Sequence, residues 1–188
     1  PDAGVFEVDG QAIGDINRGG WQRHIAHVPQ NIFLSDASIK ENIAFGVAKE
    51  KIDEKRVYAA AKQAQLSELI EGLEGRYDTL VGEQGAKLSG GQKQRIGIAR
   101  ALYNKSKIIV LDEATSALDY KTEHNVVQSI YDAGKGKTLI IIAHRISTLK
   151  DCDKVIFLKD GEIYCSGTYN DVVHSCDEVK KITKYGKL

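Results

Sequence analysis

The chain lacks an excess of either charge, a long apolar run and a cysteine-rich motif, and each absence narrows the possibilities. Lysine and arginine together number 26, as do aspartate and glutamate, so net charge gives no reason to expect a nucleic-acid or acidic-lipid partner. The longest apolar stretches, such as 139–143, are far shorter than the roughly 20 residues that cross a bilayer. Three widely spaced cysteines without a C-x-x-C pair predict unpaired thiols in a reducing compartment.

The remaining composition is that of an ordinary globular domain. The 188 residues are 42% hydrophobic and 28% charged, which suits one sizeable core with a smaller subdomain and is too apolar for disorder. The sequence contains no internal repeat and no low-complexity tract.

Hydrophobic periodicity predicts an α/β fold. Short apolar runs predict a strand at 25–28 and three strands of a parallel sheet with helices on both faces, at 108–111, 139–143 and 155–158. Helices are expected over 55–70, 91–103 and 121–131, and the last of them would complete a right-handed βαβ unit. A first strand at 5–8 and a hairpin turn at 159–161 leading into 162–165 are also expected.

Two adjacent carboxylates end one of the predicted strands. Asp112 and Glu113 follow the run 108–111, at the edge where open α/β sheets bind ligands. Carboxylate oxygens suit a hard cation such as Mg²⁺, and a neighbouring carboxylate can orient or deprotonate an attacking water. Taken alone, the two acids are equally well explained as caps of the loop that follows.

A turn of small residues opens the helix expected at 91–103. Residues 88–92 read LSGGQ, and at Ser89, Gly90 and Gly91 bare backbone N–H groups can approach a phosphate closely. By itself this signal is weak, because glycine-rich helix starts are common.

Gln30 and His144 follow two other predicted strands. Gln30 comes after Pro29 on the same side of the sheet and could reach a metal-bound water, although an ordinary strand-ending polar residue explains it as well. His144 follows the strand that ends at 143 and can sense a phosphate through a charge-assisted hydrogen bond. A lone histidine is more often a packing residue.

In this order and spacing, the motifs resemble the nucleotide-binding domain of an ATP-binding-cassette (ABC) transporter over nearly the whole chain. LSGGQ at 88–92 matches the family signature, 108–112 resembles the Walker B strand, and SALD at 116–119 resembles the D-loop. The segments 81–85 and 143–148 are similar to the X-loop and switch region of the exporter branch.

The resemblance implies a P-loop NTPase (RecA-like) fold with a mostly parallel sheet. The core would comprise 1–32 and 101–175, an α-helical signature subdomain would occupy 33–100, and a tail at 176–188 would form a solvated helix.

The resemblance also implies roles for the site residues around ATP and Mg²⁺. Glu113 would be the general base, Asp112 would hold Mg²⁺, Gln30 would contact the metal or the attacking water, and His144 would touch the γ-phosphate. Two domains would pair head to tail, so a second set of residues would act on the partner's ATP: Ser89, Gly90, Gly91, Gln92 and Asp119.

Partners and location follow from the same resemblance. The expected partners are a second nucleotide-binding domain and the transmembrane domain of the same transporter, with no nucleic acid. A homodimer is favoured because both halves of a composite site are present in this one chain. The expected location is the cytoplasmic face of a membrane.

One family motif, the phosphate-cradling Walker A loop, is missing from this sequence. Residues 136–138 read GKT, but Tyr131 stands where the first glycine of that motif belongs and a strand follows, so a turn is expected. The chain also opens in mid-turn, which predicts an N-terminally truncated domain that alone binds ATP weakly and hydrolyses essentially none.

Two other functions stay open at this stage. One is an ABC ATPase that acts without a membrane partner, and the other is a degenerate cassette that serves as a regulatory module. The presence of both Glu113 and His144 argues against the second.

Overall fold

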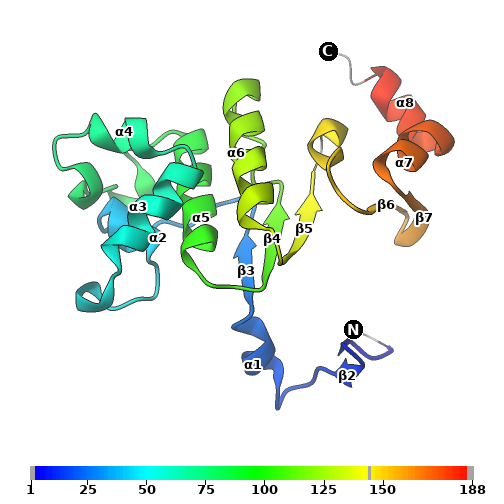
Figure 1. The fold of residues 1–188 in the computed structure, drawn as a ribbon, viewed down its shortest axis with the longest axis horizontal. Helices are drawn as coiled ribbons and strands as arrows, with labels where there is room; N and C mark the ends of the chain where they lie inside the picture. The colour runs from blue at the N-terminus through cyan, green and yellow to red at the C-terminus, as the bar shows by residue number, and fades with distance from the viewer. Residues whose placement is uncertain (1–2, 144, 186–188) are drawn as a thin grey trace. The chain divides into compact units, whose positions relative to one another are not determined.

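The computed structural model describes residues 3–143 and 145–185 and divides into two compact units, Pro1–Ile142 and Ala143–Leu188 (Figure 1). Within the described residues, no helix combines the length and apolarity needed to span a membrane. Each unit has a core of its own and is taken in turn.

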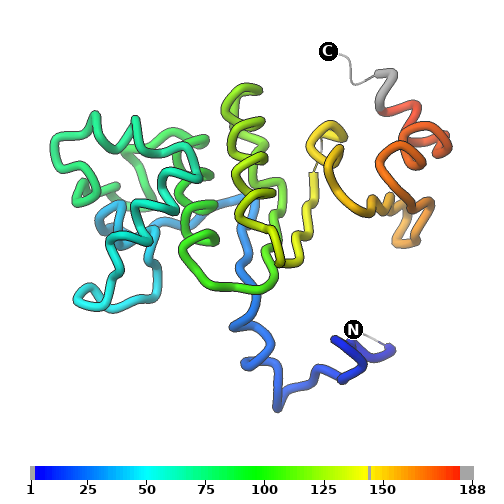
Figure 2. Tube along the Cα trace, viewed as in Figure 1, coloured from blue at the N-terminus to red at the C-terminus, as the bar shows by residue number. Residues whose placement is uncertain are grey.

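A three-stranded parallel sheet organises the first unit. Its order is β3 (Ile25–Val28), β4 (Ile108–Asp112) and β5 (Thr138–Ile142), with Val28 opposite Leu111 and Asp112 opposite Ile142. Figure 2 shows the chain leaving β3 for a long helical segment and returning to β4 beside it. The parallel pairing confirms the predicted α/β sheet, and α6 (Tyr120–Ala133) joins β4 to β5 as expected.

The helical segment lies between β3 and β4 in the sequence. Its α-helices are α2 (Ile39–Ile43), α3 (Glu54–Gln63), α4 (Ser67–Glu71) and α5 (Gly90–Tyr103), and its short 3₁₀ turns are η1 (Lys49–Lys51), η2 (Arg76–Asp78) and η3 (Glu83–Gly85). The long α5 packs against α2, α3 and β3, so the segment and the sheet share one hydrophobic core.

The single helix expected over 55–70 is wrong, because the chain breaks between α3 and α4. Gln65 has a left-handed φ of 56°, and the residues on either side, Ala64 and Leu66, are both fully buried. Residues two apart lie on nearly opposite faces of a continuous helix. The break lets both side chains enter the same core.

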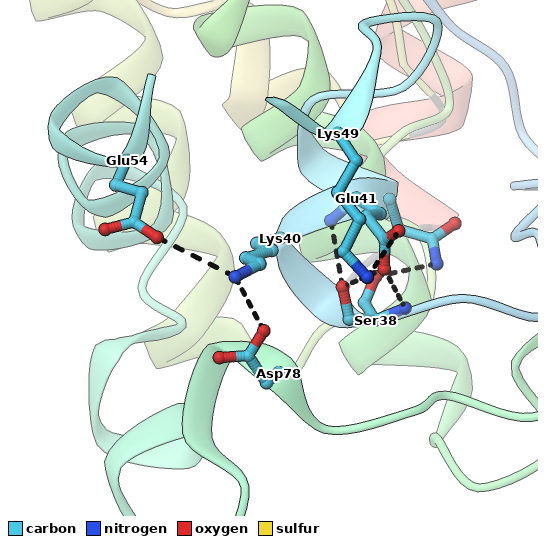
Figure 3. Close-up of polar contacts among 7 residues, drawn as sticks. Ser38, Lys40, Glu41, Lys49, Glu54 and Asp78 are labelled. Carbon is cyan, nitrogen blue, oxygen red and sulfur yellow. Dashed lines mark hydrogen bonds and ion pairs between the residues drawn. The ribbon is translucent and has the colours of Figure 1, made fainter. Parts of the chain in front are cut away.

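A network of charges holds α2 against its neighbours (Figure 3). Lys40 lies 2.6 Å from Asp78 of η2 and 3.7 Å from Glu54 of α3, and its hydrogen bond to Asp78 raises the pKa of the lysine. Ser38 and Glu41 form a capping box at the start of α2, which lowers the pKa of Glu41. These contacts link three elements of the helical segment.

The amino-terminal strand is shorter than expected and belongs to a small hairpin. β1 (Glu7–Val8) pairs antiparallel with β2 (Gln11–Ala12), and Asp9 and Gly10 turn the chain with φ of 51° and 73°. A short helix, α1 (Arg18–Gln22), leads from the hairpin to β3.

The second unit contains an antiparallel hairpin and two helices. It comprises η4 (Ile146–Leu149), β6 (Val155–Lys159), β7 (Glu162–Gly167), α7 (Tyr169–Ser175) and α8 (Asp177–Tyr185). The placement of the run 155–158 in the parallel sheet is wrong, because β6 pairs antiparallel with β7. The reason is the tight turn at Asp160 and Gly161, whose positive φ angles of 53° and 81° suit a two-residue hairpin.

Two further expectations fail in this unit. Cys165 of β7 and Cys176 at the end of α7 form a disulfide, so these two thiols are not unpaired as predicted. The cause is the folding of α7 back onto β7, which brings their Cα atoms to 6.4 Å. The tail is helical as expected, but Val179 of α8 is buried, so that helix is packed on one side.

Candidate functional site

The carboxyl ends of the three parallel strands bring the predicted polar residues to one edge. Gln30 follows β3 by two residues, Asp112 is the last residue of β4, and Glu113 comes next. The register places Asp112 opposite the final residue of β5, Ile142. This is the edge where open α/β sheets bind their ligands.

Gln30 and Glu113 are in direct contact there. The side-chain Nε2 of Gln30 donates to Oε2 of Glu113 at 2.6 Å, across 83 positions of sequence. The backbone N–H of Glu113 donates to the carbonyl of Ile142 at 2.9 Å. The side chain of Glu113 is therefore held at the end of β3, and its backbone is held at the end of β5.

Glu113 also has an unusual backbone conformation. Its φ of 49° lies in the left-handed region, which costs a residue other than glycine about 1–3 kcal/mol. Strain of this kind persists only where surrounding contacts over-determine it, and the hydrogen bonds of Glu113 to Gln30, Ile142 and Ser116 are contacts of that kind. Such strain is frequent at functional sites.

Asp112 is half-buried at the end of β4. Among the residues that the structure describes, no group of three or more His, Cys, Asp and Glu side chains could hold a metal ion. A metal at this edge would thus take few protein ligands, with Asp112 and the side-chain oxygen of Gln30 as the oxygen donors. The predicted role of His144 is not addressed, because that position lies outside the described residues.

The signature turn caps α5. Ser89 is the N-cap residue, its hydroxyl accepts from the backbone N–H of Gln92 at 3.3 Å, and its own N–H donates to the Gln92 side chain at 2.9 Å. Each side chain thus accepts from the backbone N–H of the other residue, as a capping box. Gly90 and Gly91 occupy the first two positions of α5, where N–H groups have no partner within the helix.

Gly91 lets the signature turn approach the loop after β4. A Cβ added to Gly91 would lie 3.0 Å from the backbone oxygen of Ala117 and 3.3 Å from the Leu118 side chain. A Cβ at Gly90 would meet only the Cβ of Ala117, at an ordinary 3.7 Å. Packing therefore favours glycine at position 91 independently of any ligand, because a Cβ there would fit only if the loop gave way slightly.

Gln94 of α5 joins the same two segments and was missed by the sequence reasoning. Its side chain is buried, donates to Ser116 Oγ at 3.1 Å and accepts from the backbone N–H of Ala117 at 2.9 Å. A weaker contact reaches the carbonyl of Glu113 at 3.5 Å. The sequence did hold a signal for this role. Gln94 lies one helical turn before Ile98, on the face that α5 buries.

Asp119 ends the loop by capping α6. Its Oδ1 accepts from the backbone N–H of Thr122 at 3.0 Å, and this bonding lowers the pKa of its carboxyl. Asp119 is exposed. In this single chain it acts as a helix cap.

Comparison with known proteins matches this arrangement to one family. The family model described as "ABC transporter" matches residues 1–116. The "Beta-(1-->2)glucan export ATP-binding/permease protein NdvA" of Rhizobium etli is 45% identical over 175 residues, which are 93% of this chain and 30% of that protein. "ABC transporter ATM1" of Toxoplasma gondii is 42% identical over 173 residues, 92% of this chain and 15% of that protein. "Leukotoxin translocation ATP-binding protein LktB" of a Pasteurella haemolytica-like species is 43% identical over 175 residues, 93% of this chain and 24% of that protein.

A solved structure agrees with these relatives. It is described as a bacterial Atm1-family ABC exporter with ATP bound, and it matches with a TM-score of 0.93 and 35% identity over 99% of this chain and 32% of that one. The predicted P-loop NTPase fold is thereby confirmed. The chain spans about a third or less of the length of these proteins.

Proposed function

Because the chain belongs to the ABC transporter family, we propose that it is the nucleotide-binding domain of a protein that hydrolyses ATP to export a substrate across a membrane. The observation that carries the proposal is the 2.6 Å contact between Gln30 and Glu113 at the converging strand ends. It holds a carboxylate beside Asp112, where a water and a metal ion can be bound together.

In this proposal Glu113 is the general base. Its carboxylate accepts a proton from the water that attacks the γ-phosphate, and Gln30 fixes the direction in which the carboxylate points. His144 is proposed to contact the γ-phosphate, on the strength of its place after β5 in the sequence. The strained backbone of Glu113 supports a functional requirement at this position.

The donor set at this edge fits Mg²⁺. That ion is usually bound through one or two carboxylates, with water and substrate phosphates completing its coordination. Asp112 would hold the ion, and Oε1 of Gln30 is a second oxygen of suitable chemistry. When bound, the ion neutralises charge on the phosphates.

The signature residues are proposed to serve a second copy of the domain. Ser89, Gly90 and Asp119 are exposed, and the fourteen-residue α5 directs the positive end of its dipole outward from the signature turn. Ser89, Gly91 and Gln92 would bind the γ-phosphate of the partner's ATP, and Asp119 would bridge the interface. Both halves of such a composite site occur in this chain, which favours a homodimer.

A membrane domain of the same transporter is the second proposed partner. Three residues beyond Gln30, Phe33 is 60% exposed, and it makes an edge-to-face pair with the 46% exposed Phe45. Arg100 of α5 fixes the pair, with its guanidinium over the Phe45 ring and an Nη2 bond to the Phe33 carbonyl. An exposed aromatic patch joined so closely to Gln30 is suited to transmit the state of the site to a partner.

With a membrane domain as its partner, the nucleotide-binding domain would lie at the cytoplasmic face of a membrane. The words "export", "permease" and "translocation" in the relatives' names support a transporter over an ABC ATPase without a membrane partner. The Gln30–Glu113 contact supports an active cassette over a degenerate one.

Nucleotide binding tests the proposal. The 188 residues contain no G-x-x-x-x-G-K-[ST] motif, so titration calorimetry of this chain with Mg-ATP should give weak or undetectable heat. A chimera that places the residues preceding the matched region of the Rhizobium etli relative in front of this chain should bind tightly. Equal binding by the two proteins would show that the phosphate site lies elsewhere and would overturn the assignment.

A further inference from the structure

All three cysteines of the chain lie in the second unit and pack into one cluster. Cys176 is buried with Val155, Val172 and Val179, while Cys152 and Cys165 are partly buried against them. The three cysteines thus share one small core with these three valines. None of its residues belongs to the strand-end set assigned to ATP.

Two of the three are placed for reversible bonding. Cys165 lies on β7, and Cys176 ends α7 at the junction with α8. Their Cα atoms are 6.4 Å apart, within the range of about 4.4–6.8 Å that a disulfide spans. The backbone therefore need not be rebuilt when the bond opens or closes.

The core that joins α7 and α8 to the hairpin is small. Among the residues whose burial the structure describes, the cluster has four buried members, with partly buried side chains packed around them. The ion pair at 3.2 Å between Lys159 of β6 and Glu178 of α8 is partly exposed and contributes little. Small units with so little core depend on covalent ties. Whether the disulfide is closed should therefore decide how firmly both helices are held.

Two cysteines of the cluster, Cys152 and Cys165, are partly exposed. A cavity of about 330 Å³ lies at the β7–α7 junction and is lined by Cys152, Thr168 and Tyr169, among others. Cys165 itself is only partly buried. In a reducing compartment such a disulfide exchanges with the thiol pool.

We propose that the Cys165–Cys176 pair is a redox-sensitive tie that fixes α7 and α8 to the β6–β7 hairpin. The oxidant is a small disulfide such as glutathione disulfide. One cysteine thiolate attacks it and releases one glutathione thiolate, and the second cysteine thiolate attacks the mixed disulfide and releases the other. The two protons lost by the cysteines convert the two leaving thiolates to glutathione, so electrons and atoms balance. This proposal does not rest on the ATPase function.

Alkylation and hydrogen exchange in glutathione buffers test the tie. The 188-residue chain is equilibrated in buffers whose ratio of reduced glutathione to glutathione disulfide ranges from strongly reducing to equimolar. It is then quenched with acid and alkylated. We expect the number of alkylated cysteines to fall from three to one, since two of the three join in the bond. Exchange of amides in 169–182 should be at least about thirtyfold slower in the oxidised chain, the low end of what a native disulfide contributes, while peptides of β3, β4 and β5 stay unchanged.

Matched variants assign the effect. Cys165→Ser should exchange like the reduced chain in every buffer, whereas Cys152→Ser should keep the full redox response. If Cys165→Ser fails to fold, the wild-type chain that is alkylated after reduction gives the same comparison. Three alkylated cysteines in every buffer, a loss of the response in Cys152→Ser, or a disulfide that leaves exchange in 169–182 unaltered would each overturn the proposal.

Discussion

The candidate site has two halves, the strand ends with Gln30, Asp112 and Glu113 and the signature turn at 88–92. The strand ends present side chains, whereas the signature turn presents backbone. At the strand ends two side chains face each other, Gln30 and Glu113, and a strained backbone aims the carboxylate. At the signature turn the Ser89 and Gln92 side chains each accept from the other residue's backbone N–H, and the glycines between them present bare backbone. In the proposed function the first half serves proton and metal chemistry, and the second binds an anion.

The two halves are nevertheless mechanically joined. Gly91 packs on the Ala117 carbonyl, and Gln94 bonds to the segment that begins at Glu113. A ligand that moves α5 would therefore act on the loop that begins at Glu113. Substitutions in each half can separate chemistry from packing.

The largest effect is expected from Glu113→Gln in the ATP-binding chimera. The substitution keeps the size of the side chain and an oxygen that accepts from Gln30, but removes the group that takes the proton. ATP hydrolysis, measured as phosphate release, should fall by about 100-fold or more, while Mg-ATP binding persists. Hydrolysis at the wild-type rate would exclude Glu113 as the base.

Gly91→Ala should show that the signature half depends on close backbone packing. The new Cβ would meet the Ala117 oxygen at 3.0 Å, so the loop must shift, and we expect a loss of about 1–3 kcal/mol in the free energy of unfolding. Gly90→Ala is the matched control, because its Cβ has room and alanine favours the helix by up to about 1 kcal/mol. Denaturant unfolding of both variants checks this, and equal stabilities would contradict it.

Gln94→Ala should weaken the link between the halves. It removes the acceptor for the Ala117 N–H and the donor to Ser116, at an expected cost of about 1–2 kcal/mol. Gln92→Ala on the same helix loses only the acceptor for the Ser89 backbone N–H. It should lower the free energy of unfolding by only a few tenths as much as Gln94→Ala. The same unfolding measurement distinguishes them; a larger loss for Gln92→Ala would mean that the cap, and not the bridge, dominates.

The contrast also explains what could be predicted from the sequence. The meeting of Gln30 with Glu113 follows from strand ends in a parallel sheet, and the bounds of β3 and α5 follow from strong apolar patterns. Gln94 was missed because a buried polar side chain is satisfied only by a loop distant in the sequence. The break at Gln65 and the pairing of Cys165 with Cys176 likewise depend on how elements pack, which periodicity does not record.

The smallest expected effect concerns Asp119, whose cap begins the helix after the signature-facing loop. Bonding to Thr122 lowers the pKa of this carboxyl in the folded state, so the stability it contributes is present above the unfolded pKa of about 3.9. That contribution is lost as the pH falls through the lower folded value. Asp119→Asn still caps a helix but carries no charge for the dipole. The wild-type chain should therefore be the more stable at neutral pH, and the difference should vanish in acid. Unfolding curves across that range check the sign, and a difference independent of pH would show that the charge of Asp119 is not what stabilises α6.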